Sequence, residues 1–251
     1  MNIVLFSQEE ISTPLEIKDP RAQHILNVLH KKPGDYFESG VINGKAGTAL
    51  ITAVTKDSIC FEFTAQTDGK PLYPLVLIIG FPRPIQLKRL LRDVASLGVG
   101  QVHLCVTELG EKSYLKSTLA QPNMAYEMLK DGSVQAKSTH VPDLFFHKSL
   151  TECLDCKEIT GKRQAVHLAL DNVHPECSLL SHEGLKSNNV DLLQKNGVLA
   201  AVGSERGWTD NERNLLKENE FTLCGMGSRV LRTETACTAA AALILSKMGA
   251  M

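Results

Sequence analysis

Near its carboxyl end the sequence contains the same unit twice: a short apolar segment, a loop with glycines, and a helix-forming segment. In the first unit, the apolar run 197–202 is followed by Thr209 and Glu212, whose spacing is that of a capping box at the start of a helix. The second unit runs from 221–224 through another glycine loop to an alanine-rich helix that Thr233 would cap. Open α/β sheets bind ligands beyond the carboxyl ends of their strands, so these adjacent loops predict a binding site.

From residue 75 onward, apolar segments alternate with helical ones, which predicts a parallel sheet covered on both faces. The predicted strands are 75–80, 101–107, 143–146, 165–171, 197–202 and 221–224. Between them, helices are expected over 85–97, 119–139 with an interruption at Asp131-Gly132, 150–155, 186–195 as helix or loop, and 210–219.

The first 70 residues have a different pattern. Strands predicted over 36–41, 47–54 and 58–64, with a hairpin signal at Asn43-Gly44, suggest a small β-barrel. A helix is expected over 21–30, with Ile25, Leu26, Val28 and Leu29 directed inward. Because 67–74 has the composition of a linker, the sequence predicts two domains, 1–72 and 73–251.

Composition limits the class of protein but not its function. The chain has 251 residues, 43% of them hydrophobic and 22% charged, and a net charge of −1. It contains no apolar run of about 18 to 20 residues and no secretory signal pattern, so we expect a cytoplasmic protein without a membrane partner. The net charge does not by itself favour nucleic-acid binding, which usually depends on clustered Lys and Arg.

Cysteine spacing raises the question of a metal. Cys153-x-x-Cys156 followed by His174-x-x-Cys177 has spacing compatible with zinc. The predicted strand 165–171 between the two pairs is unlike the short loop of a zinc finger, so we expect no metal and free thiols.

Two motifs connect the carboxyl-terminal loops to a known family. The first loop is G-S-E-R-G-W-T-x-x-E from Gly203 to Glu212, and the second contains R-V-L-R-T-E-T-A from Arg229 to Ala236. This pattern resembles the RsmE family, the 16S rRNA uridine-N3 methyltransferases of the SPOUT superfamily. The second motif matches residue for residue, whereas the first has Ser-Glu-Arg-Gly where the family usually has Pro-Glu-Gly-Gly.

The resemblance implies an α/β fold in which a SPOUT-type trefoil-knotted domain follows a small PUA-like, RNA-binding barrel. It implies S-adenosylmethionine as methyl donor, rRNA of the small ribosomal subunit as partner, and a homodimer formed through the knot domain. The residues implied in cofactor binding are Leu170, Val202, Gly203, Glu205, Gly207, Met226, Gly227, Val230, Leu231 and Thr233.

The candidate catalytic residues are Arg229, Arg232 and Glu234. The N3 of a neutral uridine is a poor nucleophile, so methylation requires a base, or cations that stabilise the anion. The two arginines would supply positive charge, and Glu234 would accept the proton or hold an arginine in place. The alternative is a structural ion-pair cluster at the start of the last helix.

Two groups of basic residues are candidates for RNA binding. On the helix expected over 85–97, Lys88, Arg89 and Arg92 project from the face opposite the leucines. In the first domain the candidates are Arg21, His24, Lys31 and Lys32. The alternative for both groups is a solvated surface.

Two segments depart from the family pattern where its substrate-facing residues usually cluster. Leu109 stands where the family has an arginine after Ser-Glu, and 134–138 keeps only Gln135 of Glu-Gln-x-Gly-Arg. Arginine offers planar donors that leucine lacks, so the RNA site is expected to differ. The alternatives to uridine-N3 methylation are therefore methylation of another rRNA or tRNA nucleotide, at a base or a ribose 2′-hydroxyl, and a non-catalytic RNA-binding paralogue.

Overall fold

The computed structural model describes residues 2–186 and 189–251. By its contacts the chain divides into two compact units. Unit 1 comprises Met1–Pro71 and Lys130–Val141, and unit 2 comprises Leu72–Leu129 and Pro142–Met251. Unit 1 thus includes a second segment, Lys130–Val141. The sequence around this segment does not have the composition of a linker, so its place in unit 1 was not predicted.

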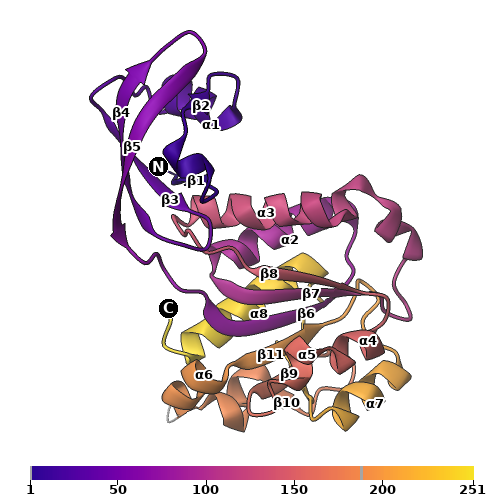
Figure 1. The fold of residues 1–251 in the computed structure, drawn as a ribbon. Coiled ribbons are helices and arrows are strands. Elements are labelled where there is room, and N and C mark those ends of the chain that lie inside the picture. Colours follow the sequence, from indigo (N-terminus) through magenta and orange to yellow (C-terminus); the bar gives the residue numbers. More distant parts are fainter. Residues whose placement is uncertain (1, 187–188) are drawn as a thin grey trace. The chain divides into compact units, whose positions relative to one another are not determined.

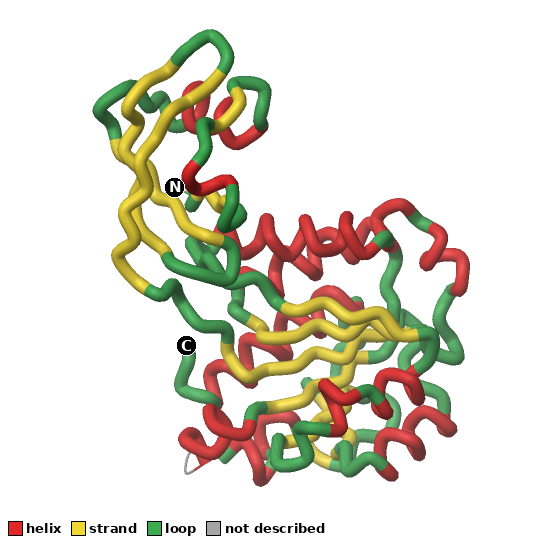
Figure 2. The backbone as a smooth tube through the Cα atoms, viewed as in Figure 1, coloured by secondary structure: helices red, strands yellow, loops and turns green. Residues whose placement is uncertain are grey.

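Unit 1 is built on a curled sheet of five strands in the order β1-β3-β4-β5-β2 (Figures 1 and 2). The strands are β1 (Val4–Phe6), β2 (Leu15–Glu16), β3 (Tyr36–Val41), β4 (Ala46–Val54) and β5 (Ser58–Thr67). Strand β1 pairs in parallel with β3, and the other pairs are antiparallel. Because β1 and β2 form the two edges among the described strands, the sheet is an open half-barrel, whereas the sequence predicted a barrel.

The helix expected over 21–30 is shorter and has a different twist. Asp19 caps α1 (Pro20–Gln23), which continues as one π-helical turn, η2 (His24–Val28). A π turn changes the direction in which the following side chains point. As a result Ile25 is buried, but Val28, expected in the core, is 62% exposed. A 3-10 turn, η1 (Glu10–Ser12), lies between β1 and β2.

Unit 2 contains a seven-stranded, entirely parallel sheet in the order β10-β12-β9-β11-β6-β7-β8 (Figure 1). Its strands are β6 (Tyr73–Gly80), β7 (Val99–Cys105), β8 (Asp143–His147), β9 (Val166–Leu170), β10 (Cys177–Ser178), β11 (Val198–Val202) and β12 (Thr222–Gly225). The six predicted strands are present. The two-residue β10 was not predicted, because its sequence lacks an apolar run.

The helices of unit 2 and its 3-10 turns connect these strands. They are α2 (Pro84–Ser96), η3 (Lys112–Lys116), η4 (Thr118–Ala120), α3 (Pro122–Gln135), α4 (Leu150–Asp155), α5 (Lys157–Thr160), η5 (Leu179–Ser181), η6 (Glu183–Leu185), α6 (Val190–Asn196), α7 (Asp210–Glu218) and α8 (Thr233–Lys247). Helix α3 runs through Asp131-Gly132 without the expected interruption and ends inside unit 1. Residues 187 and 188 of the expected segment 186–195 lie outside the described residues.

Apolar side chains of α4, α5 and α7 pack against one face of the unit 2 sheet. Helices α2 and α8 pack against each other, and they also contact β7, β6 and β11. Within α2 the leucines Leu87, Leu90 and Leu91 are fully buried, which places the basic positions of this helix on the outside. Over residues 2–186 and 189–251, the helices are too short or too polar to cross a membrane.

Candidate cofactor cavity and neighbouring surfaces

A cavity of about 250 Å³ opens at the carboxyl ends of β9, β11 and β12. Parallel strands end at the same edge of a sheet, so the loops that follow these three strands meet there. The cavity is lined by Leu170, Asp171, Asn172, Val173, Val202, Gly203, Ser204, Glu205, Arg206, Gly207, Cys224, Met226, Gly227, Arg229, Val230, Leu231, Thr233 and Ala236. All ten residues that the sequence analysis assigned to the cofactor are in this lining.

The loop after β9, where Asp171, Asn172 and Val173 line the cavity, was not predicted to belong to the site. The signal was available, because the predicted strand 165–171 ends there and its carboxyl end must lie beside those of its neighbours. Ser204 and Arg206 were also left out, although they lie within the first glycine loop.

Glycines shape the cavity at specific points. Gly207 and Gly227 have φ angles of 71° and 110°, in the left-handed region that side-chain-bearing residues rarely adopt. Gly80, at the end of β6, lies against the first loop, since a Cβ atom there would stand 2.4 Å from the backbone nitrogen of Ser204. The absence of a side chain at position 80 therefore lets the Gly203–Ser204 backbone lie close to the sheet.

Two polar contacts hold the loop after β9. The indole Nε1 of Trp208 donates a 3.0 Å hydrogen bond to the backbone oxygen of Leu170, and the Trp208 ring is buried. One residue further, Asp171 pairs with Arg213 of α7. Burial on its own would raise the pKa of Asp171, but hydrogen bonds from Arg213 and from the Val173 backbone lower it overall.

Glu205 lies on the rim of the cavity and is held from outside it. Its Oε1 accepts a 2.9 Å hydrogen bond from the backbone N–H of Arg83, the residue that precedes α2. The guanidinium Nε of Arg83 is 4.0 Å from the same oxygen. This contact orients the carboxylate while Glu205 remains part of the cavity lining.

The three candidate catalytic residues at the start of α8 differ in their exposure and in whether they line the cavity. Arg229 lines the cavity and is exposed, Arg232 is exposed outside the lining, and Glu234 is 9% exposed. Among the described residues, neither arginine forms a salt bridge, so the alternative of a structural ion-pair cluster is not what the structure contains. The expectation that Thr233 caps this helix is wrong: Arg232 occupies the N-cap position, and the Thr233 hydroxyl is buried 3.5 Å from the Gly203 oxygen.

On α2, the basic residues Lys88, Arg89 and Arg92 are all exposed. The sequence had placed them on the face opposite the leucines, and the buried Leu87, Leu90 and Leu91 agree with that arrangement. The outer face of α2 therefore carries an exposed basic stripe, which consists of Lys88, Arg89 and Arg92.

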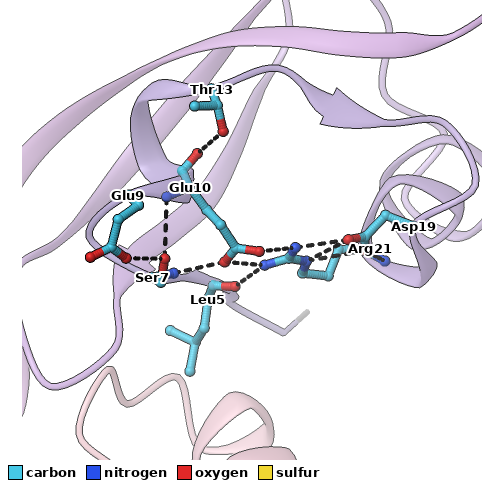
Figure 3. Close-up of polar contacts among 7 residues, drawn as sticks. All are labelled: Leu5, Ser7, Glu9, Glu10, Thr13, Asp19 and Arg21. Atoms are coloured by element: carbon cyan, nitrogen blue, oxygen red, sulfur yellow. Dashed lines mark hydrogen bonds and ion pairs between the residues drawn. The ribbon is translucent and has the colours of Figure 1, made fainter.

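In unit 1, the Arg21 guanidinium is fully engaged (Figure 3). Its Nη1 donates to the backbone oxygen of Leu5 and to Glu10, its Nη2 to Glu10 and Asp19, and its Nε to Asp19. The guanidinium carbon also lies 5.0 Å from the centre of the Phe6 ring. These contacts use all five N–H donors of the arginine, which argues for a structural role and against contact with RNA phosphate.

The other candidates in unit 1 lie on or after η2. His24 is half-buried, and its Nε2 has no hydrogen-bond partner among the described residues. Lys32 is exposed, and Lys31 is half-buried. The backbone N–H of Lys32 donates to Asp35, which fixes the turn that carries both lysines.

The zinc-like spacing noted in the sequence does not assemble. Cys177 lies on β10 and His174 just before it, at one edge of the unit 2 sheet, whereas Cys153 and Cys156 follow β8 at the opposite edge. Among the described residues, Cys156 instead lies near His103 and His147.

Comparison with known proteins agrees with this architecture. A family model described as an RNA methyltransferase domain matches residues 68–245. The chain is 40% identical over 250 residues to ribosomal RNA small subunit methyltransferase E of Treponema pallidum, covering 98% of this chain and 91% of that protein. It is 30% identical over 248 residues to ribosomal RNA small subunit methyltransferase E 1 of Borreliella burgdorferi, covering 99% of both.

Solved structures show the same fold at lower identity. The ribosomal RNA small subunit methyltransferase E of Neisseria gonorrhoeae, bound to S-adenosyl methionine, aligns with a TM-score of 0.77 at 23% identity, covering 98% of this chain and 97% of that one. A probable rRNA methyltransferase of Porphyromonas gingivalis aligns with a TM-score of 0.79 at 18% identity, covering 99% of each chain. With a family model over most of its length and two relatives at 30% identity or more, the chain belongs to the RNA methyltransferase family and, within it, to the ribosomal RNA small subunit methyltransferase E group.

Proposed function

We propose that this protein is an S-adenosylmethionine-dependent methyltransferase that methylates N3 of a uridine in the 16S rRNA of the small ribosomal subunit. The observation that carries the proposal is the cavity at the ends of β9, β11 and β12. Its lining includes all ten residues assigned to the cofactor. Family membership supports the reaction class.

The cavity suits a nucleoside sulfonium. Apolar side chains of Leu170, Val202 and Leu231 offer a surface for a purine, and backbone at Gly203 and Gly227 allows close approach. Glu205, oriented by Arg83, is placed to accept hydrogen bonds from a ribose or from an ammonium group. When bound, the cofactor supplies an activated methyl group by in-line displacement, so the protein's tasks are orientation and exclusion of water.

The residues at the start of α8 would serve the nucleophile. Methylation at N3 forms an N–CH₃ bond, breaks the S–CH₃ bond and requires that the N3 proton leave. Arg229 and Arg232, which have no ion-pair partner among the described residues, would stabilise the negative charge that develops on the uracil oxygens. Glu234, 9% exposed, would accept the proton or orient the base.

We further propose that RNA is held by the basic stripe of α2 and by Lys31, Lys32 and His24 of unit 1. Unit 1 would act as a PUA-like RNA-binding module, and unit 2 would carry the SPOUT-type trefoil knot and form a homodimer through it. On this proposal the protein acts in the cytoplasm, where its rRNA substrate is assembled. The domain division would follow the boundary expected from the sequence, 1–72 and 73–251, apart from the segment 130–141, which packs in unit 1.

One observation favours a second candidate, methylation of a different nucleotide. Leu109 replaces the family arginine and is 38% exposed, while Lys137, in the other divergent segment, forms a 2.8 Å ion pair with Glu38. Neither position offers a guanidinium to the substrate. A non-catalytic RNA-binding protein fits less well, because it would have no need of an intact cofactor cavity.

Two measurements test the proposal. Isothermal titration with S-adenosylhomocysteine should show binding, and its absence would contradict methyl transfer. Mass spectrometry of 16S rRNA nucleosides from a strain that lacks the protein should show loss of 3-methyluridine, restored by the wild-type chain and not by a Gly227→Val variant. Loss of another methylated nucleoside instead would favour the second candidate.

A further inference from the structure

Two histidines and a cysteine converge on the face of the unit 2 sheet that α4 and α5 cover. Nδ1 of His103, on β7, is 3.0 Å from Nε2 of His147, at the end of β8. Sγ of Cys156, between α4 and α5, is 4.0 Å from the same Nδ1 atom. All three donor atoms lie within 4.8 Å of one another, and none of the three residues lines the cofactor cavity.

The strand register explains why the two rings meet. In the parallel pair of β7 and β8, His103 is opposite Phe145, and His147 follows two residues later. Side chains two residues apart on a strand share a face, so both histidines point the same way. Their rings are nearly parallel, at 5°, with centroids 5.2 Å apart.

Cys156 comes from the helices that cover this face of the sheet. It ends α4 and precedes α5, and the apolar side chains of Cys153, Leu154 and Ile159 hold these short helices against the sheet. The three donors thus come from three separate elements, and tertiary packing alone brings them together.

The spacing of the donors is close to that of a tetrahedral metal site. With Zn–N bonds of about 2.0–2.1 Å and a Zn–S bond of about 2.3 Å, ligand atoms in a tetrahedron stand roughly 3.3 to 3.6 Å apart. The observed 3.0 Å and 4.0 Å lie on either side of that range, and the third pair, Cys156 Sγ and His147 Nε2, lies within 4.8 Å. Side-chain shifts of up to about 1 Å would therefore bring the donors to bonding positions.

We propose that His103, His147 and Cys156 form a binding site for a zinc-type divalent cation. Two imidazole nitrogens and a thiolate suit zinc, whereas magnesium and calcium prefer oxygen ligands. His103 is fully buried, but His147, Cys156 and the nearby Glu158 are half-buried, so a cation can enter from the surface. Glu158 interacts with the Cys156 thiol and, through its charge, with both histidines, so it adds negative charge near the three donors.

The bound cation would join the sheet edge to the helices that cover it. Strand β8 is an edge of the sheet, paired only with β7 among the described strands. A metal bond from both strands to the α4–α5 junction would restrain that edge against local opening. The site is separate from the cofactor cavity, so it can be present or absent independently of methyl transfer.

Cobalt titration of the full-length, metal-free protein tests the proposal. We expect one Co²⁺ per chain, with visible absorption of tetrahedral intensity and a near-ultraviolet charge-transfer band that reports a thiolate ligand. Zinc should displace the cobalt. Absence of the charge-transfer band would overturn the proposal.

Variants identify the ligands. Cys156→Ser should remove the charge-transfer band, and His147→Gln should weaken cobalt binding by roughly 100-fold or more, since even a supporting residue of a metal site is worth about 10 to 100-fold. Cys177→Ser, which changes a half-buried thiol at the opposite edge of the sheet, should leave both unchanged. A band that survives Cys156→Ser, or that depends on Cys177, would overturn the proposal.

A stability measurement guards against misfolded variants. Zinc should raise the Tm of the wild type and of Cys177→Ser, because it binds only the folded site, and leave that of Cys156→Ser unchanged. Far-ultraviolet circular dichroism of each metal-free variant confirms that it is folded. A zinc-induced rise of equal size in Cys156→Ser would contradict the assignment.

Discussion

The Nε atom of Arg213 donates a 2.5 Å hydrogen bond to Oδ2 of Asp171, and this ion pair joins α7 to the loop after β9. The Asp171 side chain is 2% exposed and that of Arg213 is 10% exposed. Asp171 also lines the cavity. The ion pair therefore stabilises the fold of unit 2 and also holds a residue of the candidate cofactor site in position.

Removing Arg213 should therefore affect both stability and cofactor binding. Arg213→Met leaves a buried carboxylate without its partner, and we expect a loss of about 3 kcal/mol in the free energy of unfolding. Affinity for S-adenosylhomocysteine should fall as well. Urea unfolding and isothermal titration measure the two effects. Lys217→Met on the same helix breaks a 2.8 Å but half-exposed ion pair with Glu176, and should cost less than about 1 kcal/mol with affinity unchanged.

Gly80→Ala should weaken cofactor binding by displacing the first loop. The added Cβ would meet the Ser204 nitrogen at 2.4 Å, so the backbone of the loop has to move away from the sheet. We expect a fall of roughly tenfold in affinity for S-adenosylhomocysteine, since about 1.4 kcal/mol of strain corresponds to that factor. Gly100→Ala is the matched control, because its Cβ would meet the backbone oxygen of Tyr73 at 2.5 Å, at the opposite end of β6 from Gly80. Equal loss of affinity in both variants would contradict this account.

Variants of the residues at the start of α8 should affect cofactor affinity and the rate of methylation differently. Arg232→Met and Glu234→Gln should lower kcat for rRNA methylation by roughly 100-fold while affinity for S-adenosylhomocysteine stays near that of the wild type, since neither residue lines the cavity. Arg229→Met should lower both, because Arg229 is part of the lining. Single-turnover kinetics with titration of the cofactor product checks this. Full turnover in all three variants would remove them from the mechanism.

The basic stripe of α2 should be visible in the salt dependence of RNA binding. Replacing Lys88 and Arg89 by alanine removes two phosphate contacts on our proposal, so the slope of log affinity against log salt should become shallower by about 2. The measurement is fluorescence anisotropy with an rRNA fragment at several salt concentrations. Alanine at Lys157 and Lys195, two exposed lysines on other helices, should leave the slope unchanged.

Acid should destabilise unit 1 through Glu10. Hydrogen bonds from Arg21 lower the pKa of Glu10 from 4.5 to about 2. A carboxyl with a depressed folded-state pKa adds stability above its unfolded value, and that stability is lost as the pH falls from about 4.5 towards about 2. The hydrogen-exchange protection of β1 in the full chain, corrected for the intrinsic pH dependence of amide exchange, should therefore fall over this window, and Arg21→Met should weaken that dependence. An unchanged pH dependence in the variant would assign the acid sensitivity to another group.

Local patterns were sufficient for much of unit 2. The apolar runs predicted six of its strands, and the capping box of Thr209 and Glu212 is present at the start of α7. The cavity also followed from the sequence, because strand ends and glycine loops are local signals and parallel pairing brings them to one edge.

Other features had no local signal. The π turn of η2 turned Val28 outward, and the segment after Leu129 joined unit 1 although its composition resembles the rest of α3. Arg21 looked like one of several basic residues beside a helix. The folded chain shows its structural role, because β1, η1 and the Asp19 cap place hydrogen-bond acceptors around every donor of its guanidinium.

The strands, helices and glycine loops of unit 2, and with them the position of the cofactor cavity, could be predicted from the amino-acid order alone, because burial and turn preferences repeat along the chain at the period of each element. Which polar groups meet across elements became evident only in the folded chain. The Asp171–Arg213 pair, the contacts of Arg21 and the grouping of His103, His147 and Cys156 each join residues from separate elements. The partners of a side chain depend on how the elements pack against one another. Spacing along the sequence does not reveal how far apart two residues of different elements lie in the folded chain.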